Sequence, residues 1–376
     1  MQLALFAFIR TILNTAYRMA YPFLGVFARA LGVDIKTMSL VLTARSLGGM
    51  VIPFLAPVAD SRGRKFGMLL GLGLFTFSMA LVVFIPTFPA LAVSMILATL
   101  AKYIFDPAMQ AYLGDRISYE TRGRAIAITE LGWSFAFVFG VPAAGFLIAK
   151  NGWMAPFPLL ALLGLLTFVL VAFRIPKDET PTGTPATVRM NFRRVFTSVP
   201  ALAGLSVGLW ATVANEIVNL IFGVWLEDSF GLQIAALGAS AAVIGLSEVG
   251  GEGLSGLFVD KLGKERAVGY GLVANSLAVI LLPILGRSTF GALVGLFLFY
   301  ITFEFTLVCI IPMMTEIMPT ARATLMSFNV ASLSMGRAIG APLATFLYGF
   351  GFPFVVLGTL LFNSFALLAL RRLGRE

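Results

Sequence analysis

Long apolar runs alternate with short segments of glycine, proline and charge along the whole chain. A helix needs about 20 consecutive, mostly apolar residues to cross the hydrocarbon core of a bilayer. Runs of that length predict an all-α membrane protein with 12 transmembrane helices. The predicted spans are residues 3–28, 37–59, 66–86, 89–113, 125–149, 153–173, 199–226, 233–259, 267–286, 290–317, 323–349 and 352–370.

One long polar stretch interrupts this pattern in the middle of the chain. It contains the run KDETPTGTP and the adjacent arginines Arg193 and Arg194, a composition typical of a linker. We therefore predict an N-terminal six-helix bundle at 1–175, a cytoplasmic linker at 176–198 and a C-terminal six-helix bundle at 199–376.

The two halves align when the sequence is shifted by 200 residues. The matching positions include Asp60 with Asp260, Gly63 with Gly263, Arg64 with Lys264, Arg122 with Arg322, Gly140 with Gly340, and Pro142 with Pro342. A common register across a charged loop and a later helix indicates a duplication. Two related bundles that can move against each other are typical of transporters.

The composition supports a protein surrounded by lipid. Hydrophobic residues make up 59% of the chain and charged residues 12%, whereas an ordinary soluble domain has about 25% charged residues. The chain has no histidine and one cysteine, Cys309, which argues against a zinc site, a disulfide framework and a Cys/His catalytic pair. No Walker loop and no catalytic constellation is present, so we expect no ATP-driven step, no cofactor, no metal and no enzyme activity.

Lysine and arginine positions predict the orientation. The net charge of +9 comes from short basic clusters between apolar runs, a pattern of membrane topology rather than of nucleic-acid binding. With the N-terminus inside, eighteen of the 27 basic residues fall on the cytoplasmic side and four outside. Arg10 and Arg18 lie in the first apolar run, which is therefore read as a retained helix and not as a signal peptide. We expect a multi-pass protein of the inner (plasma) membrane with both termini in the cytoplasm.

Two related loops follow the second and the eighth predicted helix. The first reads APVADSRGRK, from Ala56 to Lys65, and the second GLFVDKLGKER, from Gly256 to Arg266. Both resemble the GxxxDxxGRK loop of the major facilitator superfamily, and the likeness covers the whole chain at matching helix positions. Ala56 replaces the leading glycine in the first loop, and Glu265 interrupts the basic run of the second.

The resemblance implies a bacterial secondary transporter with two pseudo-symmetric six-helix bundles that alternate between inward-open and outward-open states. It also implies a gating role for the loops, in which a carboxylate at a helix end pairs with arginines or caps a helix when the bundles close. The residues assigned to this role are Asp60, Gly63, Arg64, Lys65, Asp260, Gly263 and Lys264. The alternative is that these are ordinary cytoplasmic loop charges.

The fifth predicted helix carries GVPAAG, from Gly140 to Gly145, and the eleventh carries GAP, from Gly340 to Pro342. The first is similar to the GPxxGG element of the superfamily's antiporters, with Val141 inserted. Glycine and proline in a membrane helix also allow close packing and a kink. An antiport role and a packing role therefore both stay open.

Ionisable side chains at bilayer depth cost at least ~2.5 kcal/mol, so they are expected to face a cavity or a partner. The first helix carries a polar stripe, the fourth a polar row at i+4 steps, and the seventh and tenth one glutamate each. In the resembled fold these four helices line the central cavity, so their polar residues are the candidate substrate-binding set: Arg10, Asn14, Tyr17, Arg18, Tyr21, Lys102, Asp106, Glu216 and Glu304. Lys102 and Asp106 can also simply neutralise each other within one helix.

A second set lies on helices two, five, eight and eleven, which the same resemblance places at the interface between the halves. Its members are Arg45, Glu130, Glu248, Glu252 and Arg337. Arg45 and Arg337 are assigned to gating, through ion pairs that break as the transporter switches. Without histidine, proton coupling must use carboxylates. The candidates are Glu304, Asp106, Glu216, Glu130 and Glu248, with structural ion pairs as the alternative reading.

These features favour proton-coupled export, by antiport, of a small organic or amphipathic molecule. Two alternatives remain. The protein can be an importer or facilitator of an organic anion or lipid-like molecule that uses Arg10 and Arg18, or a receptor-like protein that transports nothing. The expected partners are a small-molecule substrate, the lipid bilayer and protons, but no nucleic acid, and we expect a monomer.

Overall fold

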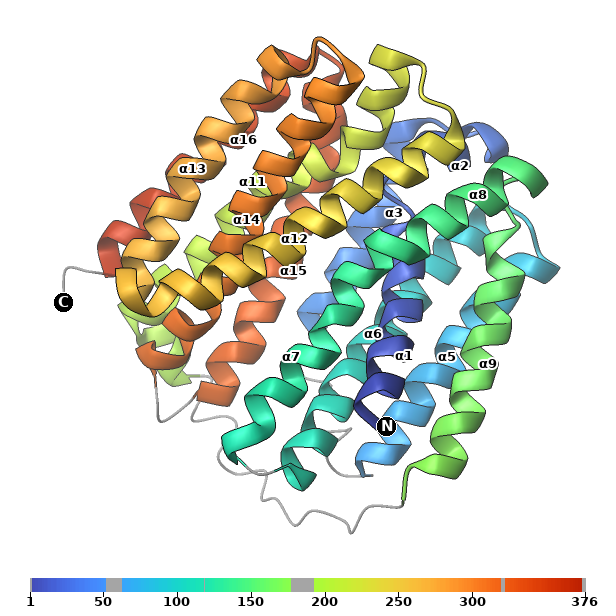
Figure 1. Ribbon diagram of the computed structural model, residues 1–376, viewed down its shortest axis with the longest axis horizontal. Coiled ribbons are helices and arrows are strands. Elements are labelled where there is room, and N and C mark those ends of the chain that lie inside the picture. Colours follow the sequence, from blue (N-terminus) through green and yellow to red (C-terminus); the bar gives the residue numbers. More distant parts are fainter. Residues whose placement is uncertain (1, 52–62, 118, 177–192, 319–321, 374–376) are drawn as a thin grey trace. The chain divides into compact units, whose positions relative to one another are not determined.

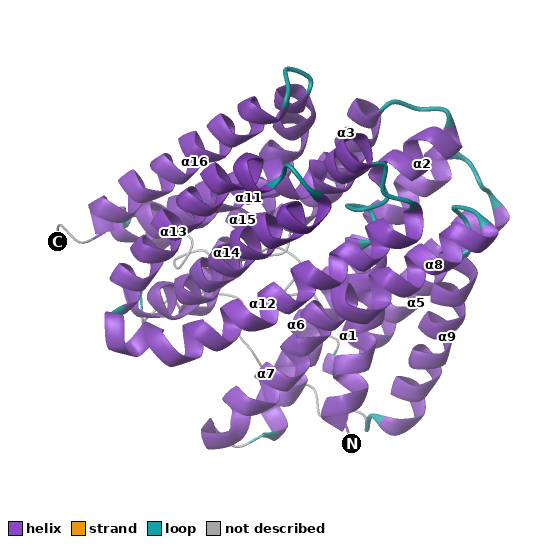
Figure 2. Cartoon of the chain, turned by 45° about the horizontal axis from the view of Figure 1, so that its top comes forward, coloured by secondary structure: helices purple, strands orange, loops and turns teal. Residues whose placement is uncertain are grey.

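The computed structural model describes residues 2–51, 63–117, 119–176, 193–318 and 322–373. Within these ranges every regular element is a helix (Figure 2). This confirms the predicted all-helical class.

Ten helical segments of the described residues are long and apolar enough to cross a membrane, and they correspond to the third to twelfth predicted spans. One of them, the fifth predicted span, is made of three consecutive elements. The segments are formed by α5 (Arg64–Phe84), α6 (Phe88–Arg116), α7 (Tyr119–Phe135) with η2 (Ala136–Gly140) and α8 (Val141–Asn151), α9 (Pro156–Arg174), α11 (Val199–Phe230), α12 (Ile234–Leu262), α13 (Lys264–Leu285), α14 (Thr289–Ile317), α15 (Arg322–Tyr348) and α16 (Phe352–Leu373).

The first predicted span, 3–28, is not one continuous helix. It consists of α1 (Gln2–Arg18) and α2 (Leu24–Leu31), separated by a turn that contains Pro22. Proline has no N–H and disfavours helical geometry in the residue before it, which explains the break. The second predicted span begins as α3 (Ile35–Leu47) and η1 (Gly48–Val51), and its remainder, 52–59, lies outside the described residues.

The helices group into two compact units. The first contains α1, α2, α5 to α9 and the first turns of α12, up to Ala242. The second contains α3, η1, α11, the rest of α12, and α13 to α16. Grouping by proximity therefore places α3 with the second unit, although it precedes the linker in sequence. The predicted division into bundles 1–175 and 199–376 concerns which parts of the chain move together, and it stays a prediction.

Packing within each unit repeats the internal symmetry of the sequence. α5 lies beside α6 in the first unit, and α13 lies beside α14 in the second (Figure 1). Two glycines related by the shift of 200 allow these close approaches. A Cβ at Gly71 would lie 2.8 Å from the carbonyl oxygen of Ala101, and one at Gly271 would lie 2.2 Å from Thr306 Oγ1. The duplicated glycines thus keep the same helix contact in both units.

Buried amides hold α14 in the second unit. Asn363 of α16 donates to Asn275 Oδ1 at 2.9 Å, and Asn275 of α13 donates to the carbonyl oxygen of Phe299 on α14 at 2.9 Å. Apolar surfaces attract one another little within a bilayer, so hydrogen bonds of this kind help to join membrane helices. They fix the helix that carries Tyr300 and Glu304.

Candidate functional site

An ionic cluster centred on a buried arginine occupies the first unit and joins three helices. Arg10 on α1 is only 4% exposed, and its Nε lies 3.3 Å from Asp106 Oδ1 on α6. Its Nη1 lies 2.5 Å from Glu130 Oε1 on α7. Lys102, one turn before Asp106, pairs with the other oxygen of that carboxylate. Gln110 donates to Glu130 Oε1 at 3.2 Å. These five residues are called the Arg10 cluster below.

The Arg10 cluster contains two cations and two carboxylates, so its formal charge is zero. Charges placed in a medium of low dielectric constant are tolerated only when they are paired and hydrogen-bonded. The predicted i+4 pair of Lys102 and Asp106 is present, but Arg10 joins it from another helix. Glu130, which the resemblance assigned to an interface between halves, lies with the predicted substrate-binding residues.

The polar stripe of α1 continues along the backbone of α7. Asn14 donates to the carbonyl oxygen of Gly132 at 3.3 Å, and Arg18 donates to that of Trp133 at 3.1 Å. A Cβ at Gly132 would lie 2.7 Å from the carbonyl oxygen of Ala7, so the missing side chain lets the two helices meet. Much of the stripe therefore holds α1 against α7.

Trp133 is the aromatic centre of this region. The guanidinium of Arg18 lies 4.2 Å from the centre of the Trp133 ring and 3.5 Å from that of Phe137. Tyr17 packs against Trp133 with ring centres 6.1 Å apart, and Lys102 Nζ lies 5.6 Å from the same ring. Cations over aromatic faces are stabilised by the ring quadrupole. Tyr21 reaches this group through Tyr17, with ring centres 6.4 Å apart.

The GVPAAG segment widens the helix beside α1. Residues Ala136–Gly140 form a π-helical turn, η2, which ends two residues before Pro142. Proline cannot donate the next hydrogen bond and its ring crowds the preceding turn, which accounts for the wider winding. A Cβ at Gly140 would lie 1.8 Å from Thr15 Oγ1, and one at Gly145 would lie 3.1 Å from the Cα of Gly238. The packing role of these glycines is therefore present in the structure.

The second unit carries a separate polar group on α11 and α14. Glu216 is 1% exposed and accepts a hydrogen bond at Oε2 from Asn219 Nδ2, at 3.2 Å. The Tyr300 hydroxyl donates to Asn219 Oδ1 at 2.8 Å. Glu304, one turn after Tyr300, is also buried. A Cβ at Gly340 of α15 would lie 2.6 Å from the Cβ of Glu216, so α15 packs directly against the base of this side chain.

Four residues of the predicted interface set lie in the second unit, and one of them, Arg337, is half-buried on α15. Arg45 is 1% exposed on α3, which packs against α15 and is joined to it by Ser39 and Thr345, whose hydroxyl oxygens are 3.3 Å apart. Glu248 is buried on α12, one turn before Gly251, and a Cβ at Gly251 would lie 2.8 Å from the Cβ of Glu304. The carboxylate-bearing stretch of α12, which also includes Glu252, thus packs against α14 at Glu304.

The comparisons with known proteins agree with this architecture. The family model described as "Major Facilitator Superfamily" matches residues 4–302 and, in a second match, residues 204–376. The chain belongs to the Major Facilitator Superfamily. It is a multi-pass membrane protein and a secondary transporter of a small molecule, and it is not an enzyme.

Relatives and solved structures of the superfamily match the chain over most of its length. It is 24% identical to the "Uncharacterized MFS-type transporter YceJ" of Bacillus subtilis, over 92% of this chain and 88% of that protein. It is 24% identical to the "Inner membrane transport protein YdhP" of Escherichia coli (88% and 85%) and 22% identical to the "Multidrug resistance protein 2" of B. subtilis (90% and 86%). The crystal structure of a D-xylose-proton symporter shares the fold, with a TM-score of 0.77, 14% identity, and coverage of 99% and 96%.

The first superfamily loop is described from Gly63 onward, and Asp60 lies outside the described residues. Gly63 has a φ of 92°, a conformation that favours glycine, and α5 begins at the next residue. Arg64 Nε lies 3.3 Å from Asp115 Oδ2 at the end of α6. Lys65 Nζ donates to the carbonyl oxygen of Ala172 at 2.7 Å, in the last turn of α9. A cation at the end of a helix compensates its exposed carbonyl groups.

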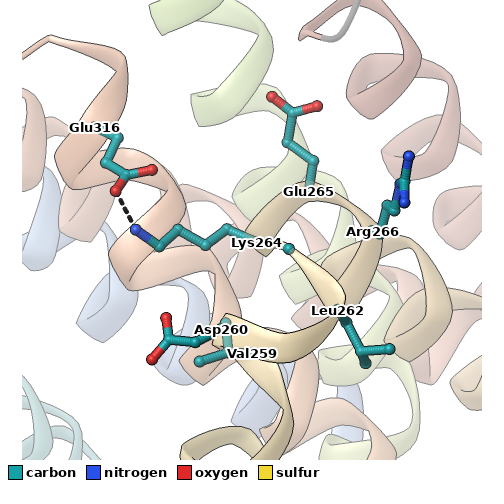
Figure 3. A pocket seen from close by; sticks show the side chains of 8 residues that line it. Val259, Asp260, Leu262, Lys264, Glu265, Arg266 and Glu316 are labelled. Carbon is teal, nitrogen blue, oxygen red and sulfur yellow. Dashed lines mark hydrogen bonds and ion pairs between the residues drawn. The ribbon is translucent and has the colours of Figure 1, made fainter.

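The second loop of the transporter repeats one of these contacts. Gly263 has a φ of 82°, and Lys264 pairs with Glu316 near the end of α14 (Figure 3). A charged pocket of about 530 Å³ lies here. It is lined by Val259, Asp260, Leu262, Gly263, Lys264, Glu265, Arg266 and Glu316 (Figure 3). In each unit, an ion pair therefore joins the start of one helix to the end of the next. It links α5 to α6 in the first unit and α13 to α14 in the second.

Sequence reasoning missed several partners in this transporter. Glu130, Trp133 and Phe137 are spaced i, i+3, i+7, which would have placed them on one helical face. Asp115 and Glu316 are also related by the repeat, at a shift of 201 instead of 200. Asn219 lies three residues after Glu216, and Tyr300 four before Glu304, but nothing local shows that these two pairs meet.

Proposed function

We propose that this transporter exports a small organic or amphipathic molecule in exchange for protons. The observation that carries the proposal is the Arg10 cluster, in which one buried arginine is shared by carboxylates from two different helices. Protonation of Asp106 or Glu130 would leave excess positive charge around the buried Arg10. That charge is costly unless Arg10 or Lys102 changes its contacts. Proton uptake is thereby linked to the contacts between α1, α6 and α7.

Three further observations support the proposal. Glu216 and Glu304 supply buried carboxylates in the second unit, so proton binding has candidates in both units. A relative named "Multidrug resistance protein 2" matches 90% of the chain. The aromatic group around Trp133, together with Arg18, suits an amphipathic substrate through ring contacts.

The same proposal assigns gating to the charged helix ends. Arg64 and Lys264 pair with Asp115 and Glu316, and such exposed pairs have contributions small enough to break and re-form during a transport cycle. Lys65 instead caps α9 through a backbone carbonyl and steadies the first unit. Arg45 and Arg337 complete the proposed gating set.

A flux assay tests the proposal. The purified protein is placed in lipid vesicles, and candidate organic molecules are screened for movement with and without a pH gradient. We expect the gradient to drive accumulation of a substrate several-fold in the wild type. Asp106→Asn and Glu304→Gln should lose this gradient-driven accumulation.

Exchange without a gradient serves as the control, because it requires substrate binding but no net proton movement. Flux that ignores the gradient, with both variants behaving as wild type, would remove proton coupling from the account. Accumulation of organic anions only would favour the importer reading, and no flux of any kind the receptor-like reading.

Both termini are proposed to lie in the cytoplasm, following the basic loop residues. Cys309 is the single cysteine and is buried against Ser255, so Cys309→Ser provides a background without cysteine. On that background we expect Lys36→Cys to react with a membrane-impermeant maleimide in intact cells. Arg371→Cys should react only after permeabilisation. The opposite labelling pattern would invert the topology.

A further inference from the structure

The hydrogen-bond chain from Tyr300 to Glu216 crosses between two helices of the second unit. Tyr300 of α14 donates to Asn219 Oδ1, and Asn219 of α11 donates to Glu216 Oε2. An amide has one accepting and one donating end. Because the hydroxyl of Tyr300 holds the oxygen, the amino group of Asn219 is directed at the carboxylate. The orientation of the Asn219 side chain thus depends on both Tyr300 and Glu216.

We propose that Asn219 and Tyr300 are positioning residues that set the pH at which Glu216 takes up a proton. This inference rests on the proposed function only where it links proton uptake by Glu216 to transport. The donated hydrogen bond stabilises the ionised carboxylate more than the neutral acid. Tyr300 acts through Asn219, since it holds the amide in the donating orientation.

The charged surroundings of Glu216 are supplied by the helices packed on α11. α14 contributes Glu304, one turn after Tyr300. α15 contributes Arg337, one turn before the Gly340 that contacts Glu216. α16 contributes Thr359, which donates to the carbonyl oxygen of Ala214, and its sequence has no ionisable residue before Arg371. The two variants proposed below leave every one of these charges in place.

The chain itself offers a matched control. Asn215 lies one turn before Asn219 on α11 and is equally exposed, at 8%. Its Oδ1 accepts no hydrogen bond from the described residues. Asn215→Leu therefore removes a buried amide of the same helix without touching the chain from Tyr300 to Glu216.

Infrared difference spectroscopy of the purified protein provides the test. The carboxyl band of Glu216 is assigned by its loss in Glu216→Gln, and its change is followed across a pH titration. In Asn219→Leu we expect the midpoint of that change to move to higher pH by about one unit, the size of a hydrogen bond to a charged group. Tyr300→Phe should move it in the same direction by less, and Asn215→Leu should leave it in place.

Unchanged midpoints in both Asn219→Leu and Tyr300→Phe would overturn the proposal, as would the absence of any titrating Glu216 band. If Asn219→Leu does not fold, Tyr300→Phe decides alone, because it removes one hydroxyl and keeps the ring. The spectroscopic result does not depend on transport. A wild type whose flux ignores the pH gradient would refute the proposed function and leave the titration to judge this inference.

Discussion

Arg10→Met is expected to destabilise the protein by about 3 kcal/mol or more and to reduce transport to background. The substitution keeps the apolar stem but removes the cation that Asp106 and Glu130 share. Removing one partner of a buried ion pair typically costs about 3–5 kcal/mol, because the remaining charge is uncompensated. Thermal unfolding in detergent and flux in vesicles measure the two effects.

Two companion variants make this prediction specific. Arg29→Met removes an exposed arginine of the same unit and should leave both stability and flux near wild type. Arg10→Met combined with Asp106→Asn should recover part of the lost stability, since Lys102 then has one less carboxylate to balance, but no transport. Wild-type behaviour of Arg10→Met would show that the cluster is dispensable.

Gly140→Ala is the second substitution with a large expected effect. The new methyl group would overlap Thr15 Oγ1, at 1.8 Å, and crowd the rest of that side chain at 2.9 and 3.0 Å. Overpacking of this kind usually costs about 1–3 kcal/mol. We expect the upper end because the Thr15 hydroxyl that the methyl group meets is held by its hydrogen bond to the carbonyl oxygen of Thr11, at 2.7 Å. The melting temperature should fall, and flux should fall with it because α1 is pushed away from the π-helical turn.

The control for this prediction is a helical glycine in the same unit. A Cβ at Gly73 would meet only the ring of Phe168, at 3.6 Å, so Gly73→Ala should be neutral or slightly stabilising. Adding Thr15→Ala to Gly140→Ala should restore part of the loss, because it removes Oγ1 and Cγ2, which would lie 1.8 and 3.0 Å from the new methyl group. A Gly140→Ala protein as stable as Gly73→Ala would contradict the close contact between α1 and η2.

The helical architecture could be predicted from sequence because a long run of apolar residues can cross a bilayer only as a helix. The backbone must satisfy its hydrogen bonds internally, so long apolar runs become helices. The break at Pro22 was missed because composition alone does not separate a kinked span from two shorter helices. The close contacts at Gly71 and Gly271 were not predicted individually, although the two residues match at the shift of 200 that relates the halves.

The candidate site was predictable only as a set of residue types. Arg10, Lys102 and Asp106 were found because charges at bilayer depth are rare and demand partners. The ion pairs of Arg10 with Asp106 and Glu130 were not predicted, since pairs between residues more than 90 positions apart leave no local spacing to read. The same holds for Asn219 and Tyr300, which are joined across 81 residues.

The central claim, proton exchange through buried carboxylates, is tested most directly by recording the pH inside vesicles while substrate moves. The account predicts that an imposed substrate gradient, with no initial pH difference, drives protons in the opposite direction to the substrate. Asp106→Asn should move substrate without this pH change. A wild type that transports its substrate while the internal pH stays constant would contradict the account.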